Sequence, residues 1–248
     1  MIVQGAFEKA RLYIESRSKS SEFNRHRVKQ GPCITISRET GAGADRVSEA
    51  IIEFFKPFND EYIHPWTVFD KNLIEKVIED HHLPHKLSQY FIEDRLSELK
   101  STVNELLGIH PHTWLLVSKT TSTILQLAHI GNVVIVGRAA NIITAGQKNA
   151  FHVRLVAPME NRIKHVEEIC DKTRKEAIEY IHKEDQARSN YLKKYFNRDV
   201  NDLSSYHLVI NTGLIPYEKA ARYICEAVME TFPELFPQHI FSSEYDYA

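Results

Sequence analysis

The stretch ITISRETGAGADRVSEAI, residues 34–51, decides the fold. It begins as an apolar, β-branched run, passes through a turn with two glycines, and continues with apolar residues at helical spacing. A strand, a glycine turn and a helix in this order present backbone N–H groups at the positive end of a helix, which is how nucleoside-triphosphate sites begin. The lysine and the hydroxyl of the standard phosphate loop are missing, because Ala44 and Asp45 hold those positions. The loop has therefore either lost its positive charge or takes it from elsewhere in the chain.

Two arginines flank the loop and offer that charge. Arg38 precedes the glycines and Arg46 follows them, and either can replace a lysine with a planar guanidinium fork. An aspartate beside a triphosphate repels it unless a metal ion or an arginine intervenes. A glycine pair after a strand is a weak motif by itself, and a plain tight turn explains it equally well. With that alternative open, we expect a phosphate to bind on the loop residues, namely Gly41, Ala42, Gly43, Ala44 and Asp45.

Composition excludes several classes of protein. A chain of 248 residues with 43% hydrophobic residues can bury one sizeable core. A formal net charge of -2 gives no general reason to expect nucleic acid or an acidic membrane as a partner. The three cysteines are widely spaced and form no metal-binding pattern, which fits a reducing compartment. With no signal-like segment and no apolar run of membrane-spanning length, we expect a cytoplasmic protein.

Four short apolar runs have the length of strands. They are rich in β-branched residues without alternation, which is typical of strands covered on both faces in a parallel sheet. Helical patterns lie between them, so the fold class is α/β with three layers around a central parallel sheet. The four runs occupy residues 32–37, 132–137, 151–157 and 206–211.

The remaining segments suggest one main domain at 31–232 with additions. Residues 1–30 read as an N-terminal helix at 3–16 followed by a basic linker. A histidine-rich helical insertion covers about 60–112, with a fifth strand suggested near 62–69. Its histidines lack the spacing of ligands on one helix face, so we predict no metal site there. The tail at 233–248 has no clear period and is expected to be loose.

Several blocks, taken in order, resemble the cytidylate kinase-like family of nucleoside monophosphate kinases. The likeness covers roughly residues 32–230, and its specificity comes from the order of the blocks. It implies a P-loop NTPase-type fold with an insertion that binds the nucleoside monophosphate and a short lid at about 172–200. It also implies that Mg²⁺ and ATP are the cofactors of phosphoryl transfer to a small-molecule nucleotide. The blocks are ITISRETGAG, VFDKNLIEKVIE, GNVVIVGRAANII, FHVRLVAPMENRIKHV, EDQARSNYLKKYFNRDVND and YHLVINTGLIPYEKAARYI.

Three arginines in these blocks suit a transferring phosphoryl group, which needs cations placed around it. Arg138 directly follows a predicted strand, at the sheet edge where ligands of α/β folds bind. Arg162 lies one turn into the next helix, and Arg188 lies in the block that resembles the lid. If the three converge on one crevice, they form a clamp for the oxyanion. For each of them, a surface or salt-bridged arginine is the alternative.

Other residues take roles from the resemblance. Asp70 would position Mg²⁺ through water or contact the acceptor, although a helix N-cap explains it too. Lys76 stands where the kinases proper carry an arginine on the acceptor phosphate, and Arg138 would share that phosphate. Asn211 and Thr212 resemble the turn beside the adenine, with an ordinary turn as the alternative.

The chain departs from the family pattern at the site itself. Cytidylate kinases proper carry Gly-Arg-Asp where this chain has Gly137, Arg138 and Ala139, so a carboxylate for the acceptor sugar is missing. The absent loop lysine is shared with the family, whereas Asp45 is not. The order of the blocks makes a nucleotide kinase our first hypothesis. The departures at the loop make a non-catalytic nucleotide-binding module with a degenerate loop the second. A scaffold that uses its two ends is the third. We expect no nucleic-acid or membrane partner and leave a homodimer open.

Overall fold

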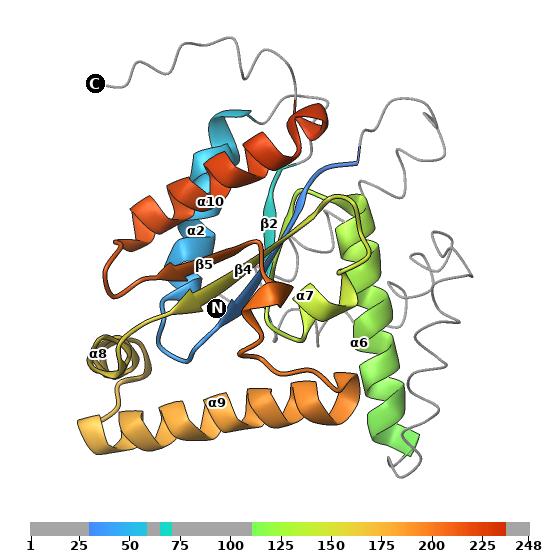
Figure 1. Ribbon diagram of the computed structural model, residues 1–248. Coiled ribbons are helices and arrows are strands. Elements are labelled where there is room, and N and C mark those ends of the chain that lie inside the picture. The colour runs from blue at the N-terminus through green and yellow to red at the C-terminus, as the bar shows by residue number, and fades with distance from the viewer. Residues whose placement is uncertain (1–29, 59–64, 71–110, 237–248) are drawn as a thin grey trace, which may run out of the picture.

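A five-stranded, wholly parallel sheet forms the centre of the protein (Figure 1). The computed structural model describes residues 30–58, 65–70 and 111–236. Parallel pairing joins every pair of neighbouring strands, in the order β2-β3-β1-β4-β5. The strands are β1 at Cys33–Arg38, β2 at Thr67–Phe69, β3 at Val133–Val136, β4 at Ala150–Val156 and β5 at Leu208–Asn211.

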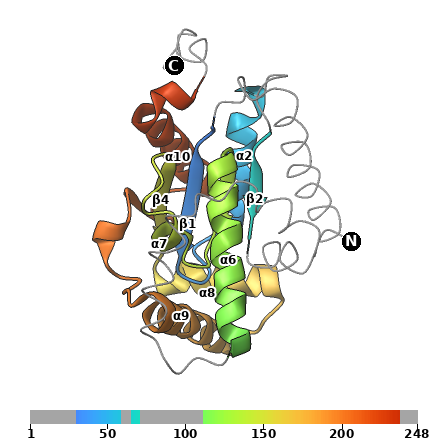
Figure 2. The same cartoon turned by 90° about the vertical axis from the view of Figure 1, so that its right-hand side faces the viewer.

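Helices cover both faces of this sheet (Figures 1 and 2). Helices α2 and α10 share one hydrophobic core with Ile34 and Ile36, while α6 and α7 share the other with Cys33. Alternate residues of β1 thus face opposite cores, which explains why the strand reads as an unbroken apolar run. The predicted three-layer α/β fold is confirmed. The helices are α2 at Ala44–Phe55, α6 at Pro111–Ile130, α7 at Ala140–Ile143, α8 at Met159–Cys170, α9 at Arg174–Phe196 and α10 at Tyr217–Thr231.

The predicted elements map closely onto the observed ones. All four apolar runs are strands, and β2 at Thr67–Phe69 falls inside the range predicted for a fifth. Helices also lie between the strands as expected, with α2 between β1 and β2 and α6 between β2 and β3. The predicted N-terminal helix, and nearly all of the predicted insertion, lie outside the described residues. Among the described residues, no helix combines the length and the apolar character that crossing a membrane requires.

The first four residues of the segment expected to be loose, 233–236, are described by the structure, and they pack on the domain. Pro233–Leu235 forms a 3-10 turn, and Phe236 behind it is buried. The Phe236 ring stacks on Phe55 with 5.8 Å between ring centroids, and Phe55 stacks on Trp66. Aromatic burial thus holds the chain beyond residue 232, a contact that periodicity could not reveal. Two further 3-10 turns lie at Lys56–Phe58 and Leu203–Ser205.

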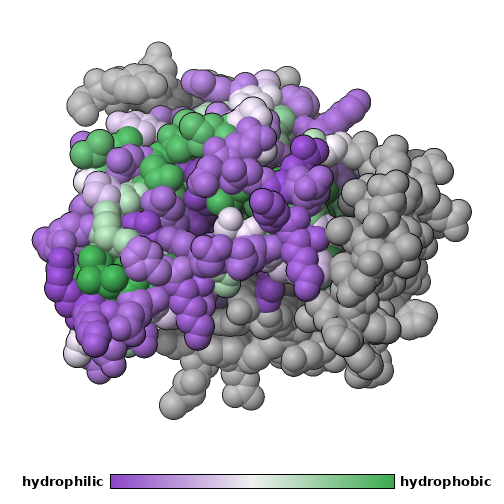
Figure 3. Space-filling model, turned by 60° about the horizontal axis from the view of Figure 1, so that its bottom comes forward, coloured by the Kyte–Doolittle hydropathy of each residue, from purple (hydrophilic) through white to green (hydrophobic). Residues whose placement is uncertain are grey.

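Helix α9 occupies most of the region predicted as a lid. It runs unbroken for 23 residues, and Figure 3 shows that the face that carries it is mostly hydrophilic. Thr173 caps the start of α9 with a capping box. Its hydroxyl oxygen accepts a hydrogen bond from the Glu176 amide, and the Glu176 carboxylate accepts one from the Thr173 amide. This cap fixes where the helix starts and therefore which of its side chains reach the sheet edge.

Candidate functional site

The loop between β1 and α2 needs both of its glycines. Gly41 and Gly43 have left-handed backbones, with φ of 82° and 72°. A Cβ atom on Gly41 would lie 2.5 Å from the Arg162 carbonyl oxygen, and one on Gly43 would lie 2.2 Å from Cε1 of Tyr217. The loop therefore packs tightly while it turns its backbone into the first turn of α2, as an anion-binding loop does.

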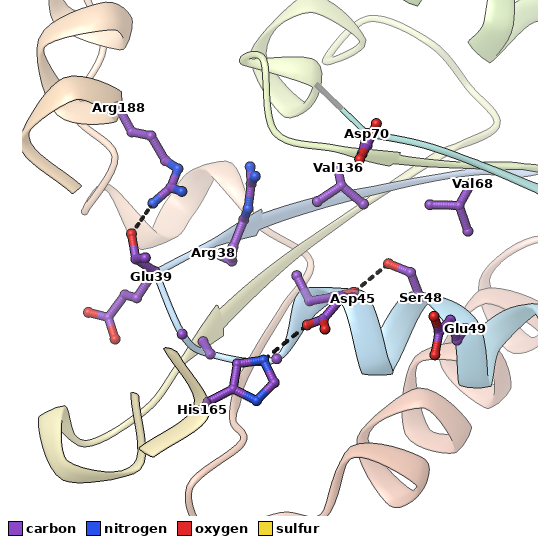
Figure 4. A pocket seen from close by; sticks show the side chains of 15 residues that line it. Arg38, Glu39, Asp45, Ser48, Glu49, Val68, Asp70, Val136, His165 and Arg188 are labelled. Carbon is purple, nitrogen blue, oxygen red and sulfur yellow. Dashed lines mark hydrogen bonds and ion pairs between the residues drawn. The ribbon is translucent and has the colours of Figure 1, made fainter. Parts of the chain in front are cut away.

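A cavity of about 420 Å³ opens beside this loop (Figure 4). The cavity is lined by residues that follow the carboxyl ends of β1 and β2. Ligands of open α/β sheets bind at this edge. Predicted residues that line it are Arg38, all five loop residues, Asp70 and Arg188. His165 of α8, which the sequence did not single out, lines it too.

Arg38 is a half-buried cation that lines the cavity. Burial, together with the guanidinium groups of Arg188 and Arg138, lowers its pKa to about 10, against the opposing pull of Asp70 and Glu184. Desolvation of a charge is costly unless charges or hydrogen bonds compensate it. An anion in the cavity would add such compensation.

Arg188 reaches the loop from α9 (Figure 4). One Nη1 hydrogen bond of 2.5 Å goes to the hydroxyl oxygen of Thr40, and another of 2.9 Å goes to Asp185. Burial lowers the pKa of Arg188, although the carboxylates of Asp185 and Glu184 oppose the shift. The predicted lid arginine therefore lies at the mouth of the loop.

Arg162 lies beneath the loop and outside the cavity. Its Nε donates to the Thr40 carbonyl oxygen at 2.7 Å, and its Nη1 lies 3.6 Å from Glu39. Its Nη2 forms a buried ion pair with Asp185. The geometry thus matches the salt-bridged alternative for Arg162, and the expected convergence of three arginines on one crevice is not what the structure has.

Asp185 is the residue that joins these groups, and sequence reasoning missed it. Its Oδ1 accepts hydrogen bonds from the Thr40 amide at 2.8 Å and from the Thr40 hydroxyl at 2.7 Å. It also pairs with Arg162 and Arg188, so one carboxylate connects α9 to the loop after β1. The only sequence signal was its position three residues before Arg188 on a helix.

Asp45 does not stand alone in the loop. Its Oδ1 lies 3.1 Å from Nε2 of His165, and Nδ1 of His165 lies 3.4 Å from the hydroxyl of Tyr217. Burial acts to raise the pKa of Asp45, but the hydrogen bond and charge of His165, together with nearby backbone amides, outweigh it and lower the pKa. Asp45 is therefore a carboxylate with a partner.

Arg138 lines a second cavity of about 270 Å³ on the α7 and α9 side of the sheet. Gly137, Arg138 and Ala139 have φ values of 83°, 54° and 57°, a run of left-handed conformations that is costly outside glycine. This turn places the Arg138 guanidinium 6.0 Å from the ring centre of Tyr191, within cation–π range. Arg38 and Arg188 line this cavity as well as the loop cavity. The two cavities therefore share a pair of arginines.

The other predicted residues lie further from the cavities. Arg46 is exposed on α2, outside the lining of both. Thr212 donates a hydrogen bond of 2.9 Å to the Ala42 carbonyl oxygen and so braces the loop, while Asn211 accepts one from the Gly213 amide in a turn. Lys76 lies outside the described residues. No group of three or more metal-ligating side chains occurs among residues 30–58, 65–70 and 111–236.

Known proteins share both sequence and fold with this chain. A sequence model described as the cytidylate kinase-like family matches residues 33–214, most of the chain. The crystal structure of an uncharacterized protein from Eubacterium ventriosum matches with a TM-score of 0.63 and 19% identity, over 81% of this chain and 99% of that one. This similarity shows a shared fold.

A curated protein also matches over part of the chain. A uronate isomerase from Corynebacterium glutamicum is 26% identical over 122 residues. That stretch is 49% of this chain, and the chain spans only 23% of the length of the isomerase. At this identity and coverage, the match assigns no activity.

Proposed function

The chain belongs to the cytidylate kinase-like family, and from this premise we propose that it transfers the γ-phosphoryl group of Mg-ATP to a nucleoside monophosphate. A cytidylate-like nucleotide or a related small phosphate is the acceptor. An oxygen of the acceptor phosphate forms the new P–O bond while the bond to the bridging oxygen breaks, so that ADP leaves. This chemistry needs positioned cations more than a covalent catalyst.

One observation carries the proposal. Two arginines from different elements, Arg38 of β1 and Arg188 of α9, line both the loop cavity and the cavity of Arg138. A donor phosphate on the loop and an acceptor phosphate near Arg138 would have these two guanidinium groups between them. Positive charge would then lie where negative charge develops during transfer.

The residues present fit the cofactors in different ways. The backbone amides of Gly43 and Ala44 at the start of α2 suit the phosphates of ATP. The carboxylate of Asp70 lines the same cavity, and Mg²⁺ is commonly held by one or two carboxylates together with substrate phosphates. When bound, Mg²⁺ supplies charge neutralisation on the phosphate oxygens. Asp45 stands where standard loops offer a hydroxyl to Mg²⁺. The Ser48 hydroxyl, which also lines the cavity, donates to the Ala44 carbonyl oxygen at 2.6 Å.

Removing Arg188 tests the assignment of the lid. We expect Arg188→Ala to lower turnover about a thousandfold, the lower end of what a transition-state arginine contributes, while Mg-ATP affinity stays within a fewfold. Turnover is measured as ADP formation with an excess of acceptor, and affinity by calorimetry. Arg222→Ala, an arginine of α10 that is paired with Glu226 outside both cavities, is the control and should keep full activity. Unchanged turnover in Arg188→Ala would remove the lid residue from the mechanism.

A second candidate function has one specific observation in its favour. Ala44 stands in place of the lysine and Asp45 adds negative charge to the loop, as in a non-catalytic nucleotide-binding module. Such a module would bind Mg-ATP saturably and form no product. The double change Ala44→Lys with Asp45→Ser would then tighten binding; if affinity did not change, the loop would not be a triphosphate site.

A further inference from the structure

His165 faces the phosphate loop from a separate helix, α8 (Figure 4). Its ring lines the loop cavity, and only 9% of the residue surface is exposed. Both ring nitrogens have partners, with Asp45 at 3.1 Å from Nε2 and Tyr217 at 3.4 Å from Nδ1. The ring is therefore held in one orientation between α2 and α10.

The packing of Tyr217 reinforces this orientation. The tyrosine ring lies so close to Gly43 that no side chain would fit there, and its centroid is 5.6 Å from that of His165. The loop glycine, the tyrosine and the histidine thus form one packed unit. A shift of His165 would disturb the loop that carries Asp45.

Charge explains what this unit does. Asp45 lies in the first turn of α2 and lines the cavity, so an uncompensated carboxylate there would repel the phosphates of a nucleotide. An imidazolium at hydrogen-bond distance cancels that charge. Other charged or titratable groups around the unit are few and of both signs: Arg46 on α2, Tyr217 and Glu218 on α10, and Glu168 on α8.

We propose that His165 is the positioning residue that makes this loop compatible with a nucleotide phosphate, by binding the Asp45 carboxylate and neutralising it. The inference rests on the proposed function in one respect, namely that a nucleotide phosphate binds on the loop. Because both ring nitrogens are engaged, His165 acts through Asp45 and does not touch the phosphate. The positive charge that a loop lysine supplies elsewhere is thus partly replaced here from α8.

Two consequences follow. Mg-ATP affinity falls when His165 is removed, because the Asp45 carboxylate then faces the phosphates uncompensated. The effect of removing His165 also depends on the presence of Asp45. If the carboxylate is absent, the histidine has nothing to neutralise.

The test is a double-mutant cycle on Mg-ATP binding, measured by calorimetry. His165→Gln should weaken binding about five- to tenfold, the effect of one partly solvated unit charge. Asp45→Asn should bind Mg-ATP at least as tightly as the wild type does. In the Asp45→Asn background, adding His165→Gln should have no further effect. His182→Gln, a change of an exposed histidine on α9, is the matched control and should bind as the wild type does.

Several outcomes would overturn the inference. A loss of affinity in His165→Gln that persists in the Asp45→Asn background would mean direct contact with the phosphate. Wild-type affinity in His165→Gln, or a loss of affinity in Asp45→Asn, would contradict it while leaving the proposed function intact. A wild-type protein that does not bind Mg-ATP would contradict both.

A second readout needs no nucleotide. The carboxyl carbon of Asp45, followed by NMR during a pH titration, reports the pKa of that group. His165→Gln should raise this pKa, because the hydrogen bond and charge that lower it are gone. An unchanged titration of Asp45 would show that the pair has no electrostatic role. If His165→Gln folds poorly, Asp45→Asn still tests the pair through its Mg-ATP affinity, because it changes only a half-exposed side chain.

Discussion

At the scale of single residues, three different elements supply the basic side chains of the loop cavity. Arg38 comes from β1, His165 from α8 and Arg188 from α9, and all three line the cavity. His165 and Arg188 are each held by a carboxylate at hydrogen-bond distance, whereas Asp70 and Glu184 act on Arg38 only through their charge. We therefore expect Arg38 to contribute most directly to phosphate binding.

The two arginines that flank the loop provide a matched pair for this expectation. Arg38→Ala should lower turnover on the order of a hundredfold or more, because it removes a half-buried guanidinium that lines both cavities. Arg46→Ala should change turnover little, because its side chain is exposed on α2. Steady-state kinetics with Mg-ATP distinguish the two. Equal losses in both variants would contradict the assignment of Arg38.

Sequence reasoning found some of these residues and missed others, for physical reasons. Arg38 and Arg188 were accessible because they lie next to the glycine loop or in a block with a family pattern. His165 was not, since it meets Asp45 from 120 residues away, and nothing in its local sequence marks that contact. Arg162 is the opposite case. Its sequence block was recognised, but only the fold shows that its guanidinium binds the Thr40 carbonyl oxygen and Asp185.

At the scale of elements, α9 and the loop form one unit through Asp185. Arg162 is 8% exposed and Asp185 is 32% exposed, so their ion pair is largely removed from water. Breaking such a pair leaves a guanidinium poorly compensated. The connection also places Arg188 at the loop, which ties the stability of the helix to the geometry of the site.

Asp185→Ala should therefore lower the free energy of unfolding by about 2 kcal/mol, less than a fully buried pair because Asp185 is partly solvated. Urea denaturation followed by circular dichroism measures the change. Glu160→Ala, which breaks the exposed pair with Arg174 between α8 and α9, is the control and should have little effect. If the two variants lost equal stability, Asp185 would not hold the helix to the loop.

His152 of β4 and His207, the residue directly before β5, form a pair of histidines that makes stability depend on pH. Burial, and secondarily the neighbouring His207, lower the pKa of His152 from 6.5 to about 4. Nδ1 of His152 lies 2.9 Å from the Thr35 hydroxyl, and the His152 amide donates to Nδ1 of His207 at 2.9 Å. The folded state therefore holds His152 neutral where the unfolded chain would bind a proton.

From this shift we expect the free energy of unfolding to fall as the pH decreases from 6.5 to about 4, by at most roughly 3 kcal/mol. The sign follows because the unfolded state binds more protons in this window. Well above pH 6.5 the histidine is neutral in both states and has no such effect. His152→Gln should flatten this part of the profile in urea melts at several pH values. An identical slope in both proteins would rule out His152 as the source.

At the scale of the whole molecule, the order of the strands brings the site together. The loop after β1, the turn after β3 and helix α9 meet at one edge of the sheet although they are distant in sequence. The strands could be predicted because parallel strands buried on both faces are continuous apolar runs. The division into two cavities, with Arg138 on one side and Asp45 on the other, could not, because it depends on how the turns pack.

The measurement that tests the central claim most directly is phosphorus NMR of the purified protein with Mg-ATP and a pool of nucleoside monophosphates. Nucleotide kinase activity predicts new diphosphate signals that grow while one monophosphate disappears, and the vanishing signal identifies the acceptor. ATP that stays intact with every monophosphate, in a protein shown to be folded and to bind Mg-ATP, would contradict a nucleoside monophosphate kinase and favour the binding module.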